Sequence, residues 1–453
     1  MLAPERRGPP AVDKTSYLLS TYDIPVPRYT SYPTAPHFTP HFGPGDFARE
    51  IAAIPADEAS LYVHLPFCQS LCWYCGCSMK VARDIDAMAA YGDAVCHEIA
   101  MVSGLLGRRQ KVSTVHFGGG TPTWGPRKSR AGIMRAIRES FDLNADAEIA
   151  LEADPRTITD ELASELADLG INRVSLGVQD FDADVQKAIN RVQPFHMVER
   201  AVTALRRVGI DRINLDLMCG LPLQTTETIE KTVDLALQLA PQRIALFGYA
   251  HVPWMKKHQR LLERHPLPSA AERYGLFAAA QARIQARGFI QIGIDHFAAP
   301  TDDLTKASVQ NALNRNFQGY TTDSSQVLLG FGASAISALS TAYAQNDADI
   351  ETYKKRISNG ALATSRGRLL TVEDLRRRAL IMDLMCRYAV VVPPDIAEGA
   401  AAALEPLLRD GLCHWENGSV LRMTADGRPW VRVVAACFDA YYQPSAARHA
   451  RAV

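Results

Sequence analysis

The sequence lacks an excess of charge of either sign. Lysine and arginine together number 49, as do aspartate and glutamate, so the formal net charge is zero. Without a net field, the chain has no global electrostatic attraction for nucleic acid or for an anionic membrane surface, although local patches remain possible. We therefore expect neither nucleic acid nor a membrane among its partners.

Long apolar runs are also missing. The first twenty residues, MLAPERRGPPAVDKTSYLLS, have no apolar core of the kind that a signal peptide needs. No run of eighteen apolar residues occurs, so no membrane span is expected, and we expect a cytoplasmic protein. The 453 residues, 47% of them hydrophobic, provide enough material for a large core and for more than one domain.

Cysteine is scarce, and its nine copies form an odd number. An odd count in a reducing compartment argues against a disulfide framework. Five cysteines are scattered among apolar neighbours and are expected to be small core residues: Cys96, Cys219, Cys386, Cys413 and Cys437. The other four are concentrated in one short stretch: Cys68, Cys72, Cys75 and Cys77.

Regular structure is predicted from residue 60 onward, where short strand-like runs alternate with amphipathic helical stretches. Strands alternating with helices indicate βαβ units and a parallel sheet. We expect an α/β fold with a partial parallel barrel of six strands. The predicted strands are 61–67, 114–118, 148–153, 173–178, 212–218 and 243–249, with a possible seventh at 289–297.

The remaining chain is expected to surround this barrel. Residues 1–55 are rich in Pro, Gly and Tyr and are expected to form an irregular arm that covers the active site. The barrel takes up 56–300, and 301–369 are expected to be its extension and a connector. Residues 370–453 are predicted to form a small, mostly helical, winged-helix-like domain. The basic stretch 253–266 is expected to be a surface loop and helix start.

The unusual residues fall at the carboxyl ends of the predicted strands. In strand order they are the four cysteines, Gly118–Pro122, Glu152, Gln179, Asp216 and Tyr249–Trp254. In a parallel barrel these ends share the face that holds the active site. We therefore expect six strand ends to meet at one mouth. Because an unpaired buried carboxylate is costly, Glu152 and Asp216 must each have a partner: an arginine, a backbone N–H or a bound ligand.

Three explanations compete for the clustered cysteines. Inert buried thiols conflict with so high a local density. Structural zinc usually takes two separated pairs of ligands, and no distant Cys/His pair is evident. An iron–sulfur cluster held by three thiolates fits the spacing C-x3-C-x2-C of Cys68, Cys72 and Cys75, and it leaves one iron open to another ligand. By spacing alone, Cys77 remains a candidate fourth ligand.

This motif, with an aromatic residue before its last cysteine, is the signature of radical S-adenosylmethionine (SAM) enzymes. The longer context resembles one family, the oxygen-independent coproporphyrinogen III oxidases, over most of the chain. The matching blocks are RYTSYPTAPHF (28–38), LYVHLPFCQSLCWYCGC (61–77), HFGGGTPT (116–123), EADPRTIT (152–159), GVQDFDADVQKAINRVQP (177–194), DLMCGLP (216–222), GIDHF (293–297), NRNFQGYTT (314–322) and LLGFGASAIS (328–337).

The resemblance implies an oxidoreductase of haem biosynthesis. Its reaction is the oxidative decarboxylation of two propionates of coproporphyrinogen III to vinyls, giving protoporphyrinogen IX, through a 5′-deoxyadenosyl radical from SAM. The implied cofactors are one 4Fe-4S cluster and two SAM molecules. The implied partners are the porphyrinogen substrate and an electron donor such as a flavodoxin or ferredoxin, and the protein is expected to be a monomer.

The resemblance also implies the site residues. Cys68, Cys72 and Cys75 bind the cluster, whereas Cys77 does not. It implies no catalytic side chain beyond the cluster and SAM. Contacts with the two SAM molecules are expected from Tyr62, Tyr74, Gly120, Thr121, Pro122, Glu152, Gln179, Arg191, Asp216, Ala250 and Ile336.

These contacts are expected to divide between the two SAM molecules. Gly120 and Glu152 are assigned to the SAM at the cluster. The second SAM is assigned Thr121, Pro122, Gln179, Arg191 and Asp216. Ordinary packing is the alternative for both tyrosines, a plain tight turn for the glycines, and a solvated helix face for Arg191.

The substrate carries four propionates, which are ionised at neutral pH because a carboxyl pKa lies at about 4.3. Arginine forks match carboxylates well, and the candidates are Arg28 and Arg315. An internal salt bridge is the alternative role for Arg315.

Three other functions were weighed. Haem chaperones of the same superfamily are shorter and lack both the Gly-Cys after the motif and the PRYTSYPT arm, which are present here. Haem-degrading relatives are a second alternative. A DNA-binding regulator is the third, but the C-terminal region offers no evident basic recognition helix.

Overall fold

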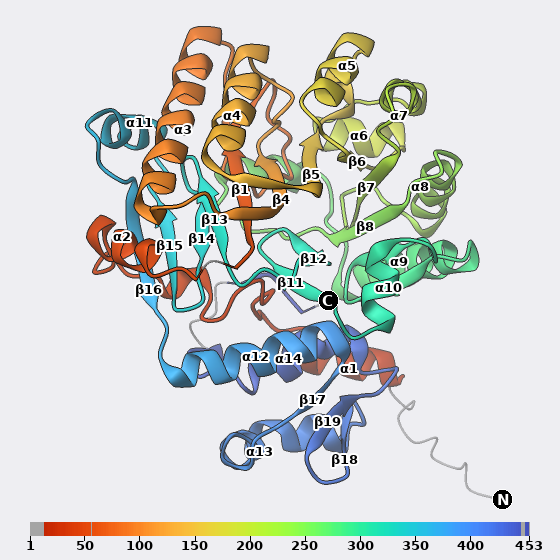
Figure 1. The fold of residues 1–453 in the computed structure, drawn as a ribbon. Coiled ribbons are helices and arrows are strands. Elements are labelled where there is room, and N and C mark those ends of the chain that lie inside the picture. The colour runs from red at the N-terminus through yellow and green to blue at the C-terminus, as the bar shows by residue number, and fades with distance from the viewer. Residues whose placement is uncertain (1–12, 56, 445–448, 453) are drawn as a thin grey trace, which may run out of the picture.

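The computed structural model describes residues 13–55, 57–444 and 449–452. The first twelve residues of the predicted arm therefore lie outside the described residues. A twelve-stranded sheet forms the centre of the molecule (Figure 1). Its middle consists of six parallel strands: β1 (Ala59–Leu65), β4 (Lys111–Gly119), β5 (Asp142–Ala153), β6 (Arg173–Gln179), β7 (Arg212–Cys219) and β8 (Arg243–Gly248). All six predicted strands are confirmed, with ends that shift by a few residues.

Further strands extend the sheet at both edges. Beyond β1 it continues through β13 (Leu328–Phe331), which pairs parallel to β1, and then through three antiparallel strands. These are β14 (Ile336–Ala338), β15 (Ala342–Asn346) and β16 (Thr364–Leu369). Because β8 pairs with an antiparallel strand and not with β16, the sheet forms an open, partial barrel.

The predicted seventh strand at 289–297 is wrong. This run forms two short antiparallel strands, β9 (Ile290–Ile292) and β10 (His296–Ala298), beside β8. Gly293 lies between them with a φ of 58°, a left-handed conformation that glycine adopts without strain. The turn reverses the chain inside what reads as one apolar stretch.

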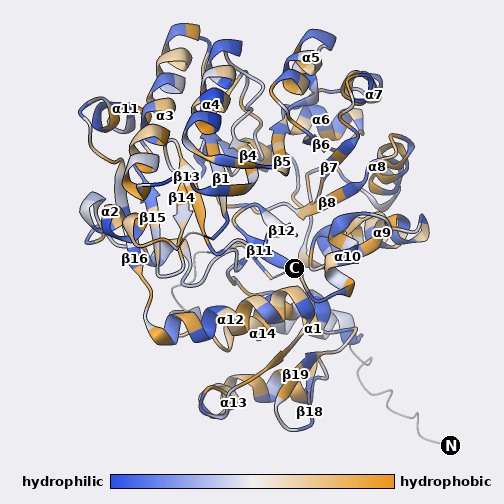
Figure 2. Ribbon diagram, in the orientation of Figure 1, coloured by the Kyte–Doolittle hydropathy of each residue, from blue (hydrophilic) through white to orange (hydrophobic). Residues whose placement is uncertain are grey.

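Helices cover the outer face of the sheet (Figure 1). The longer ones are α3 (Ile85–Leu106), α4 (Arg127–Ser140), α5 (Asp160–Asp168), α7 (Phe195–Arg207), α8 (Thr226–Gln238) and α9 (Ala270–Ala286). Hydrophobic and hydrophilic residues alternate along α3 and α4 in Figure 2, as expected for helices with one face on a core. Side-chain oxygens of Asp84, Thr225 and Ser269 cap the first turns of α3, α8 and α9. None of the described helices combines the length and apolar character that a membrane span requires.

The N-terminal arm is less irregular than predicted. It contains two nine-residue helices, α1 (Lys14–Tyr22) and α2 (Pro44–Ala52). Phe47 and Ile51 of α2 pack into the core of the sheet and its helices. Leu18 of α1 instead belongs to a separate core with the C-terminal residues. Both helices bury a few apolar residues at helical spacing. In the sequence this periodicity is hard to recognise, because the region is rich in Pro and Gly.

The C-terminal residues form helices around a small sheet. The helices are α12 (Val372–Arg387), α13 (Pro394–Arg409) and α14 (Val431–Ala436). The antiparallel sheet has the order β17 (Ala389–Val391), β19 (Val420–Met423), β18 (Cys413–Glu416).

Of the five scattered cysteines, Cys219, Cys386 and Cys413 are buried, and Cys96 and Cys437 are partly buried against the two cores. The prediction that they are packing residues is confirmed.

Candidate active site

The carboxyl ends of the central strands surround a cavity of about 530 Å³, here called the cluster cavity. Most of the predicted site residues line it: Arg28, Cys68, Cys72, Tyr74, Cys75, Gly120, Thr121, Glu152, Gln179, Arg191, Asp216 and Ala250. The predicted convergence of the strand ends at one mouth is therefore confirmed. Four predicted residues do not line this cavity: Tyr62, Pro122, Ile336 and Arg315.

The cysteine loop begins at β2 (Phe67–Cys68) and crosses the mouth of the cluster cavity. The Cys68 thiol lies 3.3 Å from Thr121 Oγ1, and Arg191 Nη1 lies 3.4 Å from the Cys72 thiol. The backbone N–H of Cys77 donates to Cys75 Sγ at 3.4 Å. A hydrogen bond from the Cys77 side chain is the main cause that lowers the Cys75 pKa to about 6, and the backbone N–H of Cys77 adds to this effect. The Cys75 thiol is thereby set up to serve as a thiolate ligand, whereas burial raises the Cys68 pKa to about 11.

The chemistry of these donors suits an iron–sulfur cluster, because thiolates are its usual ligands. Among residues 13–55, 57–444 and 449–452, no three Cys, His, Asp or Glu side chains form a site for a single metal ion. Cys68, Cys72 and Cys75 instead border the same cavity from one loop. In a cluster each thiolate binds a different iron, so the three thiols need not converge on one point.

The glycine-rich turn after β4 packs directly against the start of the cysteine loop. Gly120 N–H donates to Leu65 O at 2.9 Å, and Thr121 N–H donates to Phe67 O at 2.8 Å. A Cβ atom at Gly120 would lie 2.8 Å from the Phe67 carbonyl oxygen, which leaves no room for a side chain. The turn thus needs glycine for a close approach of two backbones.

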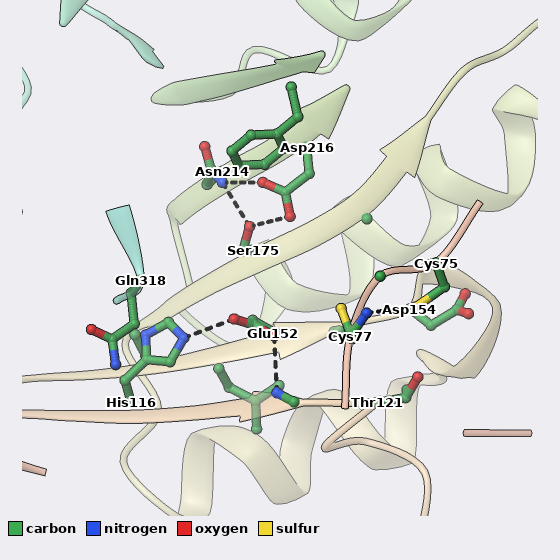
Figure 3. A pocket seen from close by; sticks show the side chains of 18 of the residues that line it. Cys75, Cys77, His116, Thr121, Glu152, Asp154, Ser175, Asn214, Asp216 and Gln318 are labelled. Atoms are coloured by element: carbon green, nitrogen blue, oxygen red, sulfur yellow. Dashed lines mark hydrogen bonds and ion pairs between the residues drawn. The ribbon is translucent and has the colours of Figure 1, made fainter. Parts of the chain in front are cut away.

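Glu152 has a side chain that is 40% exposed to the cavity, and it has two hydrogen-bond partners. It accepts hydrogen bonds from His116 Nε2 at 3.1 Å and from the Gly119 N–H at 3.2 Å (Figure 3). Burial alone would raise the Glu152 pKa, but the hydrogen bonds from His116 and Gly119 outweigh it and lower that pKa. A carboxylate held ionised at the cavity wall can bind an ammonium or hydroxyl group of a ligand.

Asp216 lies in a second polar group, on the β6–β7 side of the cavity. It accepts from Ser175 Oγ at 2.9 Å and from Asn214 Nδ2 at 2.8 Å (Figure 3). Burial raises the Asp216 pKa to about 6, and the negative charge of Glu152 adds to the shift. The two carboxylates are therefore within electrostatic reach of each other but have separate hydrogen-bond partners.

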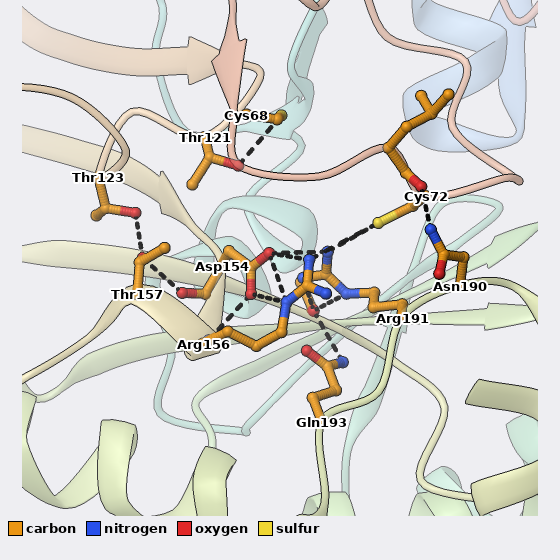
Figure 4. Close-up of polar contacts among 12 residues, drawn as sticks. Cys68, Cys72, Thr121, Thr123, Asp154, Arg156, Thr157, Asn190, Arg191 and Gln193 are labelled. Atoms are coloured by element: carbon orange, nitrogen blue, oxygen red, sulfur yellow. Dashed lines mark hydrogen bonds and ion pairs between the residues drawn. The ribbon is translucent and has the colours of Figure 1, made fainter. Parts of the chain in front are cut away.

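A third group joins Arg191 to Asp154 (Figure 4). Asp154 Oδ2 accepts from Arg191 Nη1 at 3.1 Å and from Arg156 Nη2 at 2.6 Å. Arg191 Nε also donates to Gly177 O at 3.1 Å, and the residue is 6% exposed. The alternative of a solvated helix face for Arg191 is therefore wrong. Asp154 was missed, although it follows Glu152 by two residues, the spacing that keeps side chains on one face of a strand.

A bulge turns Gln179 toward the cavity. In the pairing of β6 with β7, Gly177 lies opposite Asp216, whereas Gln179 lies opposite Leu217, so one residue of β6 is extra. Gln179 has a φ of 67°, and a Cβ atom at Gly177 would lie 2.9 Å from Gln179 Nε2. Such bulges re-aim side chains next to active sites.

The two tyrosines differ in position. Tyr62 lies behind the cavity wall, where its hydroxyl is 3.0 Å from His64 Nδ1 and its ring stacks on His116 at 5.9 Å. Through His116 it supports Glu152. Tyr74 is buried and lines the cavity, and its backbone oxygen accepts from Gln259 Nε2.

The arginines proposed for the substrate lie next to each other. Arg28 lines the cavity and donates to Gly248 O at 3.3 Å, and Arg315 Nη2 donates to Arg28 O at 3.4 Å. The Arg315 guanidinium lies 4.3 Å from the centre of the Tyr320 ring. Within the described part of the chain Arg315 has no ion pair, so the alternative of an internal salt bridge is not seen.

Sequence comparisons agree with this geometry. Residues 62–236 match the family model described as the Radical SAM superfamily. A relative from Bradyrhizobium diazoefficiens, an oxygen-independent coproporphyrinogen III oxidase, is 45% identical and covers 94% of this chain and 97% of its own length. A relative of the same name from Escherichia coli is 38% identical over 96% of this chain and 97% of its own. The chain belongs to the oxygen-independent coproporphyrinogen III oxidases.

A solved structure of the same family supports the assignment. Coproporphyrinogen III oxidase from Escherichia coli, described as a radical SAM enzyme, has a TM-score of 0.87 and 37% identity. The match covers 93% of this chain and 100% of the other. As an oxygen-independent coproporphyrinogen III oxidase and radical SAM protein, the chain is an oxidoreductase that uses SAM and an iron–sulfur cluster.

Proposed function

We propose that this protein converts two propionates of coproporphyrinogen III to vinyls without oxygen, giving protoporphyrinogen IX in haem biosynthesis. The observation that carries the proposal is the cluster cavity, where three thiols share one space with Glu152 and Asp216. Near-full-length identity to named oxidases favours this function over a haem chaperone or a haem-degrading enzyme.

The cofactors supply the one-electron chemistry when bound: a reduced cluster and SAM together generate a 5′-deoxyadenosyl radical that abstracts hydrogen. The chain's own residues bind and orient. Cys68, Cys72 and Cys75 are the proposed ligands of a 4Fe-4S cluster, while Cys77 remains outside the ligand set. The strand-lined cavity, once the cofactors and substrate fill it, would exclude water and side reactions.

We further propose that two SAM molecules bind, because Glu152 and Asp216, two of the carboxylates on the cavity wall, have separate hydrogen-bond partners. Glu152, held by His116 and the glycine-rich turn with Gly120, would bind polar groups of the SAM at the cluster. Asp216, held by residues of β6 and β7, would bind the second SAM. The second SAM would also contact Thr121, Pro122, Gln179 and Arg191. Tyr62, Tyr74, Ala250 and Ile336 complete the proposed set, with Ile336 and Tyr62 acting from outside the cavity wall.

The electron donor is proposed to be a small acidic protein such as a flavodoxin or a ferredoxin. The stretch that begins at Lys256 and continues as η3 (Lys257–Arg264) is basic and lies on the outer side of the cysteine loop. Lys256 Nζ donates to Cys77 O at 2.6 Å, and His258 Nε2 lies 2.8 Å from Cys75 O. Its exposed cations lie next to exposed Trp254 and would attract an acidic partner close to the cluster.

We propose that the enzyme acts as a cytoplasmic monomer.

Anaerobic turnover tests the proposed function. The reconstituted protein is incubated with coproporphyrinogen III, SAM and a reductant, and the products are oxidised to porphyrins and separated by chromatography. We expect protoporphyrin that depends on SAM, together with a monovinyl intermediate. Binding of the substrate without any vinyl product would contradict the proposed function and favour a haem-carrier role.

A further inference from the structure

A second cavity, of about 710 Å³, adjoins the cluster cavity. It lies between the end of β8, helix α9 and the C-terminal residues 425–432 and 449–452. Both cavities are lined by Arg28, Gly248, Tyr249 and Ala250, so they are adjacent and share these residues as a common wall. Its volume is typical of small-molecule sites. We call it the arginine cavity.

The lining of this cavity carries far more positive than negative charge. Its arginines are Arg28, Arg273, Arg428, Arg432 and Arg451, and its one acidic residue is Asp295. Asp295 Oδ1 is already 2.7 Å from His296 Nδ1, and Asp23, outside the lining, binds two of the arginines. Within the described part of the chain, Arg28, Arg428 and Arg432 have no ion pair.

Arg432 is the clearest case of a buried cation that has no direct ion pair in the described part of the chain. It is 7% exposed, and among the described residues it donates to the main-chain carbonyls of Val26, Arg451 and Ala452. Burial, together with the nearby charge of Arg28, lowers the Arg432 pKa to about 9, and the charges of Asp295 and Asp23 offset this only in part. A buried charge without a directly bound counter-ion is costly, so an anion bound beside Arg432 would stabilise this arrangement.

Arg315 adds a further unmet donor behind Arg28. Its Nε and Nη1 atoms are buried and have no hydrogen-bond partner among the described residues. Burial lowers the Arg28 pKa, which again reflects a cation short of counter-charge. Arg28 from the arm and Arg428 and Arg432 from the C-terminal region thus line one space, and Arg315, which lines neither cavity, lies behind Arg28.

The other walls of the arginine cavity are apolar and aromatic. They include Leu246, Tyr249, Trp254, Leu267, Phe277 and Ile294. Apolar walls with a few convergent charges suit a ligand that has a flat or bulky apolar body and carboxylates at its edge.

We propose that the arginine cavity binds the carboxylates of a macrocyclic polycarboxylate, so that Arg28, Arg428 and Arg432 hold the propionates that are not reacting. This assignment rests on the proposed function and adds to it the position of the substrate. Because Arg28 borders both cavities, it would hold a propionate where one edge of the macrocycle faces the cluster cavity and the opposite edge lies in the arginine cavity. Rotation of the ring between the two would bring the second propionate to the same cofactor.

Equilibrium binding of a stable ligand tests the assignment. Reconstituted protein is titrated anaerobically with coproporphyrin III, the oxidised form of the substrate with all four carboxylates, and binding is followed by porphyrin fluorescence. The variants are Arg28→Gln, Arg428→Gln and Arg432→Gln. The matched control is Arg422→Gln, an exposed arginine of β19 outside the cavity that pairs with Glu416.

We expect each of the three variants to weaken coproporphyrin III binding by about tenfold or more, and the control to change it less than twofold. The same substitutions should weaken the binding of mesoporphyrin less, because mesoporphyrin carries only two carboxylates. If Arg432→Gln does not fold, as judged by circular dichroism, the exposed Arg428→Gln variant decides the result. Wild-type affinity in Arg28→Gln and Arg428→Gln would overturn the assignment even if vinyl products form. Tight, arginine-dependent binding without vinyl products would instead overturn the proposed function alone.

Discussion

Arg191 and Asp154 form a buried ion pair at the wall of the cluster cavity, with 3.1 Å between Nη1 and Oδ2 and each side chain 8% exposed. The same guanidinium reaches the Cys72 thiol and the Gly177 carbonyl. One side chain therefore connects the cysteine loop to the ends of β5 and β6. The position of Cys72 relative to the strand ends depends on this contact.

Removal of the arginine should destabilise the protein. Arg191→Met leaves Asp154 buried with Arg156 alone, so the free energy of unfolding should fall by about 3 kcal/mol. Chemical denaturation of the reconstituted protein measures this change. The control is Arg422→Met, which removes an exposed pair with Glu416 and should cost about 1 kcal/mol or less. Equal losses in the two variants would contradict a structural role for the Arg191 pair.

The cluster should depend on three of the four clustered cysteines. Alanine at Cys68, Cys72 or Cys75 should remove the visible absorption of the reconstituted cluster, because each thiolate would bind its own iron. Cys77→Ala should keep most of it. Iron and sulfide analysis provides an independent count. Full absorption in Cys72→Ala would show that the ligand set is wrong.

Asp216 should make stability depend on pH. Its folded pKa of about 6 lies above the ordinary value of 3.8, so the folded state holds this proton more tightly than the unfolded chain. The stability from this proton is fully present below pH 3.8 and is lost as the pH rises through 6. Asp216→Asn has no carboxyl group to titrate at this position, so it avoids the loss. As the pH rises from 5 to 8, its free energy of unfolding should therefore rise relative to that of the wild type by on the order of 1 kcal/mol.

Melting temperatures across this pH range measure the effect. Asp146→Asn, at an exposed position of β5, is the control and should follow the wild type at every pH. The Asn variant should also bind less SAM while it keeps the cluster, if Asp216 serves the second SAM. A constant difference between Asp216→Asn and wild type from pH 5 to pH 8 would argue against the raised pKa.

Charge reversal on the basic stretch should separate electron delivery from chemistry. Lys257→Glu with Arg260→Glu should slow turnover with a reduced acidic flavodoxin by about tenfold, mostly at low salt. Turnover with dithionite should not change. Lys111→Glu with Arg207→Glu, at exposed positions near the amino ends of β4 and β7, is the matched control. An equal loss of turnover with flavodoxin and with dithionite would mean that the substitutions damage the active site and do not act on the docking of the flavodoxin.

The strands and the convergence of their ends were predictable, because apolar runs and polar strand ends are local features of the sequence. The β9–β10 hairpin was not, since it depends on the left-handed turn at Gly293 inside an apolar run. The helices of the arm were missed because α1 and α2 are short and obtain their stability from two different cores.

The site was predictable residue by residue only where a residue follows a strand or matches a motif. Asp154 and its pairing with Arg191 join residues far apart in the sequence, and no local pattern predicts such a pair. The arginine cavity was missed for the same reason. Arg432 and Arg451 read as ordinary charges of a helical tail until the fold brings them beside Arg28.

The ratio of 5′-deoxyadenosine to CO₂ tests the central claim most directly. Wild-type protein is supplied anaerobically with coproporphyrinogen III labelled with ¹³C in its propionate carboxyls, SAM and reductant, and both products are measured over time. The account predicts equal amounts of the two, with two of each per protoporphyrinogen IX. Deoxyadenosine formed without labelled CO₂ would contradict it, because SAM cleavage would then not be coupled to decarboxylation.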